Sequence, residues 1–274
     1  MIRVEFSKQV RRLRTYLVLG ICVVIPAIIT MATKVGGPHE PMGPTSERLA
    51  NQADFFRLAT RSGLSMPLAA LTAMSGFLLP IVVALFCGEA VAGEAGWGTL
   101  RYLLVRPVTR RRLLGAKLSV AAMLCLLATV LVALTGLVAG LAAFGWHPML
   151  TPSSTTLPEA TALARVGLAT VYVAWSMSGM ATFAFLLSTM TDAPVGAIAG
   201  GVGLAIVSQI LDGISALRGF RNWLPTHHWG AWDGLFVHPT QTADMVRGTL
   251  LQIPYVIVFC VVAWWWFARK DVLS

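Results

Sequence analysis

The chain of 274 residues is 56% hydrophobic and only 12% charged, which excludes an ordinary soluble domain, where about a quarter of the residues are charged. Its formal net charge of +9 does not indicate a nucleic-acid-binding protein, because the basic residues gather where apolar runs end, as topology signals and contacts to anionic lipid do. An integral membrane protein is the class that uses so much apolar surface, and this length allows several spans of about 20 residues.

The first segment of the chain, residues 1–15, predicts an amphipathic helix that lies in the membrane interface. Its apolar residues recur at helical spacing and fall in one arc, with the basic residues outside it. The apolar set continues into the first span and comprises Ile2, Phe6, Val10, Leu13 and Leu17, and the basic set comprises Arg3, Lys8, Arg11, Arg12 and Arg14. A plain topology anchor would need the charges but not the apolar stripe. Residues 16–274 form the second unit, a membrane domain.

Six apolar runs in this domain are long enough to cross a bilayer. They predict helical spans at about Tyr16–Thr33, Met66–Cys87, Leu118–Phe144, Val166–Thr189, Val195–Ile214 and Thr249–Ala268. The fourth and fifth runs are separated by residues 190–194 alone, which predict a tight hairpin loop. We therefore expect an all-α membrane protein with six transmembrane helices.

The distribution of basic residues predicts the sidedness of these spans. Of the 21 Lys and Arg residues, five lie in the N-terminal segment, six in the connection between the second and third spans, and two at the C-terminus. The other eight are spread through the longer connections on the opposite side. By the positive-inside rule, both termini and the connection 88–117 are cytoplasmic.

The connection 88–117 has an internal pattern of its own. Gly96-Trp97-Gly98 breaks the chain, Thr99–Val105 can form a short helix, and Pro107 disfavours its continuation. Glu94 precedes this helix, where the helix dipole favours an anion. Thr109 is a candidate N-cap for the helix of the third span.

Three arginines, Arg110, Arg111 and Arg112, would occupy the first turn of that next helix. There they carry the wrong sign for the helix dipole, at about 0.3–1 kcal/mol each. Something anionic should offset this cost. Either lipid phosphates or the acidic surface of a partner protein would do so.

These residues resemble a known signature. Glu94, Gly98-Thr99-Leu100-Arg101, Leu103-Leu104, Arg106-Pro107-Val108, Arg110 and Lys117 are similar to the cytoplasmic motif of ABC-2-type permeases, the membrane subunits of type-2 ABC exporters. The resemblance extends over nearly the whole chain, since the basic N-terminal helix and the short 190–194 loop also match. The connection 215–248 resembles, in its first part, the short re-entrant helices of these exporters.

The resemblance implies a mechanical role for the connection 88–117. It would be a coupling helix seated in a groove of a cytoplasmic ABC ATPase subunit, with the N-terminal helix beside it as a connecting helix. Two permease chains, identical or different, would move together between inward-facing and outward-facing states. The residues that would transmit force are Glu94, Gly98, Thr99, Leu100, Arg101, Arg106, Pro107 and Arg110.

The chain carries no nucleotide-binding motif. It has no Gly-Lys dipeptide, so the phosphate-cradling loop GxxxxGK[ST] is absent. We therefore expect no cofactor and no enzymatic activity in this chain, and ATP and magnesium would be bound by the partner ATPase.

Neither the histidines nor the cysteines show metal-ligand spacing. His227, His228 and His238 lack an HxxxH pattern, and Trp223, Trp229 and Trp232 nearby suit an interfacial aromatic belt or a ligand site. The cysteines, Cys22, Cys87, Cys125 and Cys260, are far apart in apolar runs and are interpreted as packing residues. Ionisable residues are nearly absent from the spans, which disfavours a proton-coupled transporter.

We expect a permease subunit in a bacterial inner membrane that exports a hydrophobic or amphipathic molecule, such as a drug, a peptide antibiotic or a lipid-like compound. A second hypothesis is a non-transporting membrane anchor or sensor that recruits a cytoplasmic ATPase through the same connection. A third is a membrane-embedded enzyme, which would require paired histidines within spans or a catalytic group at the interface.

Overall fold

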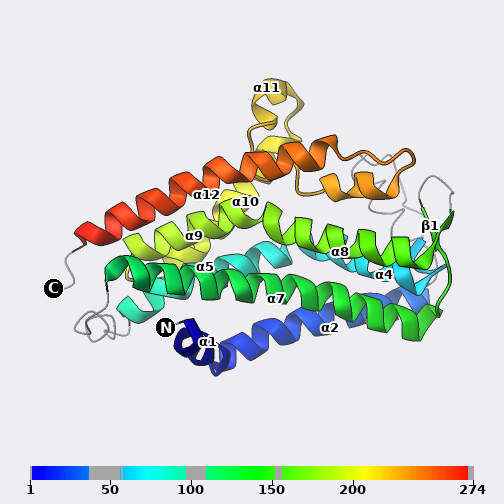
Figure 1. Cartoon of the computed structure of the whole chain (residues 1–274), viewed down its shortest axis with the longest axis horizontal. Coiled ribbons are helices and arrows are strands. Elements are labelled where there is room, and N and C mark those ends of the chain that lie inside the picture. Colours follow the sequence, from blue (N-terminus) through cyan, green and yellow to red (C-terminus); the bar gives the residue numbers. More distant parts are fainter. Residues whose placement is uncertain (1, 37–55, 57, 97–108, 152–155, 271–274) are drawn as a thin grey trace.

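The chain is mostly helical, because a helix satisfies its own amide and carbonyl groups without water. A computed structural model describes residues 2–36, 56, 58–96, 109–151 and 156–270. In Figure 1 the long helices run side by side along one axis. The helical elements are α1 (Ile2–Val10), α2 (Leu13–Gly36), η1 (Gly63–Ser65), α4 (Met66–Ser75), α5 (Leu78–Gly96), α7 (Arg110–Phe144), α8 (Glu159–Ser176), α9 (Ser178–Met190), α10 (Pro194–Gly213), η2 (Ser215–Leu217), α11 (Arg218–Arg221), η3 (Ala231–Phe236) and α12 (Ala243–Arg269).

Six helical segments are long and apolar enough to cross a membrane. They are Leu13–Gly36, Leu78–Gly96, Arg110–Phe144, Glu159–Met190, Pro194–Gly213 and Ala243–Arg269. The fourth consists of α8 and α9, which are separated at Met177. At this level the predicted all-α fold with six spans is confirmed, and the arrangement is that of a multi-pass membrane protein.

The second span departs from the predicted range, Met66–Cys87, which is split between α4 and α5. The break follows from Pro80. In a continuous helix the proline ring would clash with the carbonyl group of Gly76, four residues earlier, and proline has no N–H group to donate to that carbonyl. The Gly76 carbonyl oxygen instead accepts a hydrogen bond from Gln209 Nε2 of α10 at 2.9 Å. A side chain from a neighbouring helix therefore supplies the partner that the helix lacks.

α5 also continues through the first part of the predicted polar connection, residues 88–96, so the helix extends beyond the predicted span end at Cys87. The small residues of this stretch allow close packing. A Cβ atom added at Gly88 would lie 3.0 Å from the Ile198 backbone nitrogen of α10, and one added at Gly96 would lie 3.0 Å from the Asp192 carbonyl oxygen. The helix therefore carries Glu89 and Glu94 into contact with its neighbours instead of leaving them in a loop.

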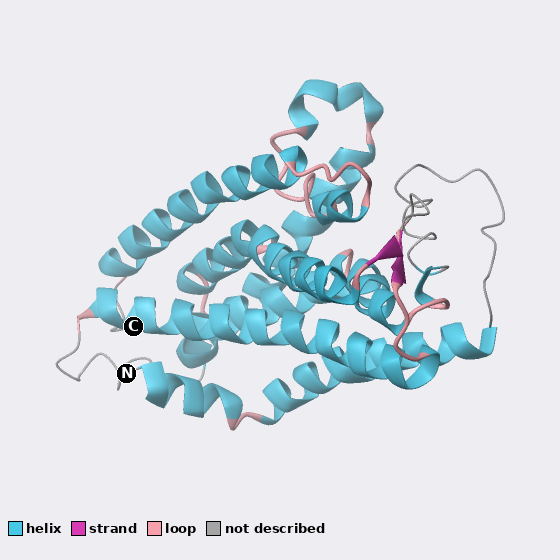
Figure 2. Ribbon diagram, turned by 45° about the vertical axis from the view of Figure 1, so that its right-hand side comes forward, coloured by secondary structure: helices cyan, strands magenta, loops and turns pink. Residues whose placement is uncertain are grey.

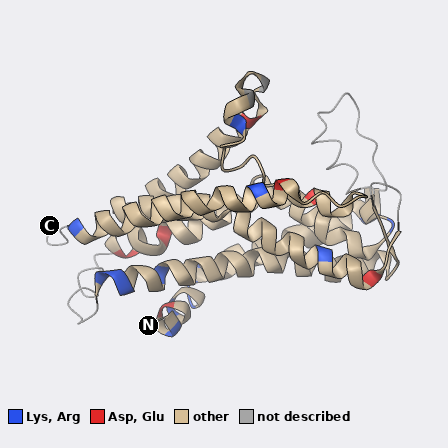
Figure 3. Cartoon of the chain, turned by 45° about the horizontal axis from the view of Figure 1, so that its top comes forward, with Lys and Arg blue, Asp and Glu red and all other residues tan. Residues whose placement is uncertain are grey.

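The bundle has two chemically different ends. We call the end with α1, the C-terminal end of α5, the start of α7 and the end of α12 the terminal end, and the opposite end the far end (Figure 1). In Figure 3 the long helices are largely tan, and Lys and Arg gather toward the terminal end, with smaller groups toward the far end. The far end carries a small antiparallel pairing of β1 (Met149–Leu150) with β2 (Thr156–Leu157), visible in Figure 2.

α5 lies at the centre of the bundle, where it packs against α7, α9 and α10 and is buried along most of its length. α2, α10 and α12 form the periphery and leave many large apolar side chains exposed, among them Leu17, Val207 and Val258. A soluble protein would not expose apolar faces of this extent, whereas the hydrocarbon of a bilayer accepts them.

Two helices touch through their backbones at the far end, where α7 crosses η1 and the start of α4. A Cβ atom added at Gly140 would lie 2.5 Å from Met66 Cβ and 2.6 Å from the Gly63 carbonyl oxygen. Such small-residue crossings are a common basis of helix association in membranes. The position therefore requires glycine for steric reasons.

We predict that Gly140→Val lowers the free energy of unfolding by about 1–3 kcal/mol, because the crossing helices must move apart to admit the side chain. Gly115→Ala is the matched control, since a Cβ atom at this position of the same helix meets nothing within 4 Å. Thermal unfolding of the purified chain in a nonionic detergent would measure both variants. Equal melting temperatures for the two would contradict the close crossing.

Candidate functional site

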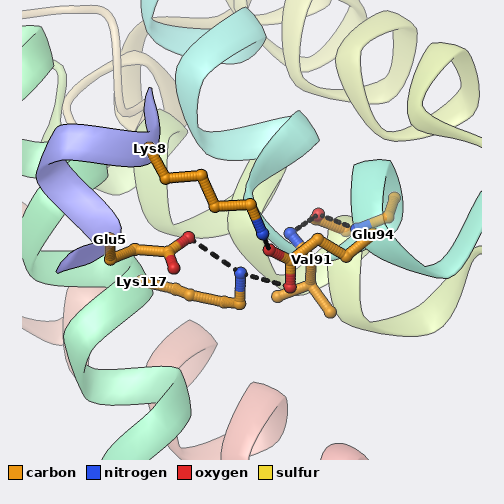
Figure 4. Close-up of polar contacts among 7 residues, drawn as sticks. Glu5, Lys8, Val91, Glu94 and Lys117 are labelled. Carbon is orange, nitrogen blue, oxygen red and sulfur yellow. Dashed lines mark hydrogen bonds and ion pairs between the residues drawn. The ribbon is translucent and has the colours of Figure 1, made fainter. Parts of the chain in front are cut away.

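Four charged side chains from three helices meet at the terminal end. They are Glu5 and Lys8 of α1, Glu94 of α5 and Lys117 of α7, and we call them the ion-pair cluster. Figure 4 shows these side chains pointing toward one another from three directions. Lys117 Nζ lies 3.0 Å from Glu5 Oε1 and 2.6 Å from Glu94 Oε2, and Lys8 Nζ contacts Glu94 Oε1. Positive and negative groups therefore alternate through the cluster.

The two central members of the cluster are almost fully buried. The side chain of Lys117 is 1% exposed and that of Glu94 is 2% exposed, whereas Lys8 is 40% exposed. A buried charge is tolerated when opposite charges and hydrogen bonds replace its hydration. Each of the two buried groups has two partners of opposite sign, and the four formal charges sum to zero. The cluster thus closes the end of the apolar core without an uncompensated charge.

Apolar and charged side chains both hold α1 in place. Phe6 and Val10 pack against the hydrophobic core, while Ile2 is largely exposed. Glu5 and Lys8, three residues apart, share one side of the helix. Lys8, one of the basic residues outside the apolar arc, is paired with Glu94.

A second contact reinforces the connection between the N-terminal segment and α5. Arg14, at the start of α2, forms an ion pair with Glu89. Both glutamates near the end of α5 are therefore neutralised by cations of residues 2–36. The N-terminal segment thus supplies cations that neutralise glutamates of α5, in addition to the positive charge that predicts the topology.

The end of α5 is also fixed from the opposite side, by α9. The Ser188 hydroxyl oxygen accepts hydrogen bonds from the backbone N–H groups of Val91 and Ala92 at 3.0 and 2.9 Å. Ser188 is fully buried, so these bonds are shielded from water. The last turns of α5, which carry Glu94, are therefore held between α1, α7 and α9.

Arg110, at the start of α7, binds the end of α12. Its guanidinium group donates hydrogen bonds to the carbonyl oxygens of Phe267, Ala268 and Lys270, at 3.2, 3.3 and 2.9 Å. These carbonyls belong to the end of α12, where a cation is favourable. The carbonyl end of α12 therefore supplies the negative partner for Arg110 that the sequence pattern demands.

The remaining predicted coupling residues cannot be placed in this way. Gly98, Thr99, Leu100, Arg101, Arg106 and Pro107 lie outside the described residues. Thr109 occupies the N-cap position of α7 with extended backbone, but its side chain makes no capping hydrogen bond. Of the predicted set, the structure therefore places Glu94 and Arg110, at the two edges of the connection 97–109.

Sequence reasoning missed Glu5, Glu89 and Ser188 as parts of this site. The acidic residues carried a usable signal, because each lies close to the boundary of an apolar helix, at the same end as an excess of basic residues. Ser188 carries no such signal, since serine is common in membrane helices as a packing residue.

A second polar group lies toward the far end, around the buried carboxylate of Asp212. Arg221 Nε lies 3.3 Å from Asp212 Oδ1, and His227 Nδ1 contacts the same oxygen. No three His, Cys, Asp or Glu side chains are arranged to hold a metal ion anywhere in the described part of the chain. All four cysteines are free thiols.

Removing one partner of the ion-pair cluster should leave a buried charge unpaired. We predict that Lys117→Met destabilises the chain by about 3–5 kcal/mol, because Glu94 loses its more buried partner. The double variant Lys117→Met with Glu94→Gln should recover part of this loss, since the unpaired carboxylate is gone. Thermal unfolding in nonionic detergent gives both values.

The matched control is a pair with an exposed carboxylate at the same end: Lys270 Nζ lies 2.7 Å from Asp192 Oδ1, and the aspartate side chain is 70% exposed. Asp192→Asn should cost less than about 1 kcal/mol. Equal losses for Asp192→Asn and Lys117→Met would contradict the importance of burial.

The pH dependence of stability should report on His228. Burial and the neighbouring His227 imidazole lower the pKa of His228, and Arg247 adds to the shift, while Asp244 and Asp212 oppose it. The folded chain therefore binds fewer protons at this site than the unfolded chain. The resulting stability is present above the ordinary histidine pKa of about 6.5 and is lost as the pH falls below it. The melting temperature should decrease less between about pH 7.5 and pH 5.5 in His228→Gln than in the wild type; parallel curves would contradict this.

Comparison with known proteins gives a family but no function. No curated protein matches the chain significantly. A family model matches residues 56–273, which include Glu94 and Lys117 but not α1. The chain belongs to this family, described as "Protein of unknown function (DUF2705)".

Proposed function

We propose that this chain is the transmembrane permease subunit of an ATP-driven exporter of the ABC-2 type. It would work as a homodimer or heterodimer in a bacterial inner membrane, with ATP and magnesium bound by separate cytoplasmic ATPase subunits. The observation that carries the proposal is the ion-pair cluster at the root of the connection 97–109. Glu94, the first residue of the resembling motif, is buried there between two lysines of other helices.

The cluster suits the transmission of a mechanical displacement. A movement of the connection 97–109 would act on the last turn of α5, which is bound to α1 through Lys8 and to α7 through Lys117. Paired buried charges resist separation, since each partner loses its neutralisation when they part. A push at the connection would therefore move α1, α5 and α7 together instead of bending one helix.

The character of the bundle supports a hydrophobic or amphipathic cargo. The buried core is formed by apolar side chains of α5, α7, α8 and α9, and Figure 3 shows few charged residues along the long helices. A strongly charged solute would find few partners along such a path. The terminal end, with most of the Lys and Arg residues, would face the cytoplasm and its ATPase.

Transport by inside-out membrane vesicles tests the proposal. Vesicles that contain the chain together with its proposed ATPase subunit should take up a fluorescent amphipathic compound when ATP is added. ATP hydrolysis that proceeds without uptake of any amphipathic compound would support a membrane anchor or sensor that only recruits the ATPase. Labelling of a cysteine at position 101 from outside intact cells would contradict the proposed sidedness.

We predict that Glu94→Gln lowers ATP-dependent uptake at least about fivefold, because the link from the connection 97–109 to α1 and α7 is weakened. A factor of about five corresponds to the lower end of typical allosteric coupling energies. Asp192→Asn, an exposed acidic residue at the same end, is the control and should retain uptake. Both variants should be compared at equal amounts of chain, with intact assembly checked by size-exclusion chromatography. Full uptake by well-assembled Glu94→Gln vesicles would exclude a coupling role for this residue.

A further inference from the structure

A pocket of about 630 Å³ lies between the segment 222–231 and the first half of α12. Its volume is within the range of about 300–1,000 Å³ that is common for small-molecule sites. Figure 1 shows α11, just before this segment, projecting from one side of the bundle next to α12. The lining includes Trp223, His228, Asp244, Arg247 and Leu251. None of these residues belongs to the ion-pair cluster at the terminal end.

The wall of this pocket is held in a fixed shape by side chains from the bundle. Tyr172 Oη donates to the His228 carbonyl oxygen at 2.7 Å, and Tyr255 Oη donates to that of Trp223 at 2.6 Å. Gln252 Nε2 donates to the Pro225 carbonyl oxygen at 2.8 Å. Gln252 and Tyr172 are buried, so the two hydrogen bonds that they donate are protected from competing water. The backbone that carries Trp223 and His228 is therefore preorganised.

Close packing brings α12 against this wall. A Cβ atom added at Gly248 would lie 2.3 Å from Tyr172 Oη and 2.6 Å from His228 Cβ. On the other side of the segment, the carboxylate of Asp212 is bound by Arg221 and His227. The pocket wall is thus anchored at both edges, which reduces the entropy that a ligand would lose on binding.

The chemistry of the pocket combines one charge of each sign with an apolar floor. Asp244 and Arg247 lie one helical turn apart, with 3.4 Å between Arg247 Nη1 and Asp244 Oδ1, and both side chains are mostly exposed. Leu250, Leu251 and Pro254 line the pocket further along the same helix. The indole of Trp223 is 67% exposed and presents an aromatic face.

We propose that this pocket binds a zwitterionic amphiphile. The cationic group of the ligand would lie against Asp244 and the aromatic face of Trp223, where a cation is attracted to the ring. The anionic group would pair with Arg247, and the apolar part would cover Leu250, Leu251 and Pro254. This binding site does not depend on whether the chain exports anything.

The charge pattern disfavours two simpler classes of ligand. A purely anionic amphiphile would place its charge beside the Asp244 carboxylate as well as Arg247. An uncharged amphiphile would desolvate both charges without replacing their hydration. A ligand that carries both charges avoids both costs. A phospholipid with a zwitterionic headgroup and an apolar peptide with free termini both have this chemistry.

Native mass spectrometry of the full chain in nonionic detergent would test the proposal. The probes are three lipids with the same short acyl chains: a phosphatidylcholine, a phosphatidic acid and a diacylglycerol. Tetraleucine with free termini is the fourth probe. Phosphatidylcholine or tetraleucine should bind at least about tenfold more tightly than diacylglycerol and phosphatidic acid.

Variants separate the pocket from general adsorption. Arg247→Ala and Leu251→Trp should each abolish the preference for the zwitterionic probe, the first by removing a charge and the second by filling the pocket. The double exchange Asp244→Arg with Arg247→Asp should retain the preference, since one charge of each sign remains. Arg61→Ala removes an exposed charge that does not line the pocket and is the matched control.

Each outcome decides the proposal. Equal binding of all four probes, tighter binding of phosphatidic acid, or an equal loss in Arg61→Ala and Arg247→Ala would overturn it. Tighter binding of phosphatidylcholine than of tetraleucine assigns the pocket to a membrane lipid, and the reverse order assigns it to a peptide-like solute.

Discussion

The neutralisation of Glu94 inside the bundle is the interaction on which the terminal end depends. Its carboxylate is buried among α1, α5 and α7, and the ammonium groups of Lys8 and Lys117 make that burial tolerable. Glu5 is the second partner of Lys117, so Lys117 and Glu94 would each lose one charged partner if the short helix α1 left its place. A segment of nine residues is thereby made part of the membrane bundle.

The same constraint, that polar groups away from water need partners, explains the irregular points of the helices. Where Pro80 interrupts the second span, Gln209 supplies a donor to the freed carbonyl of Gly76. Where α8 ends, the indole N–H of Trp229 donates to the Ser176 carbonyl oxygen at 2.8 Å. Each break in a helix is thus paired with a polar side chain from a neighbouring element.

The number of spans could be predicted from the sequence because hydropathy over about 20 residues is a local property. The break at Gly76 could not be located in the same way, although Pro80 signals it, because the apolar run continues across the break. The sequence did mark Glu5 as an acidic residue at the basic end, but it did not reveal the partner of Glu5: Glu5 and Lys117 are 112 positions apart, and nothing local indicates that their helices meet. The positive charge of Arg110 at the start of a helix, where the helix dipole favours an anion, did indicate a missing negative partner. A single sequence offered no reason to choose the end of α12 as that partner.

The bond between Arg110 and the end of α12 has a practical consequence. One nitrogen of this guanidinium group, Nη1, reaches three carbonyl oxygens, so a single side chain joins the start of α7 to the end of α12. The last helix is thereby clamped to the point where the chain enters α7. Any load attached behind residue 274, such as a reporter domain or a surface tether, would pull on that entry point, so it needs a flexible spacer to leave the clamp undisturbed.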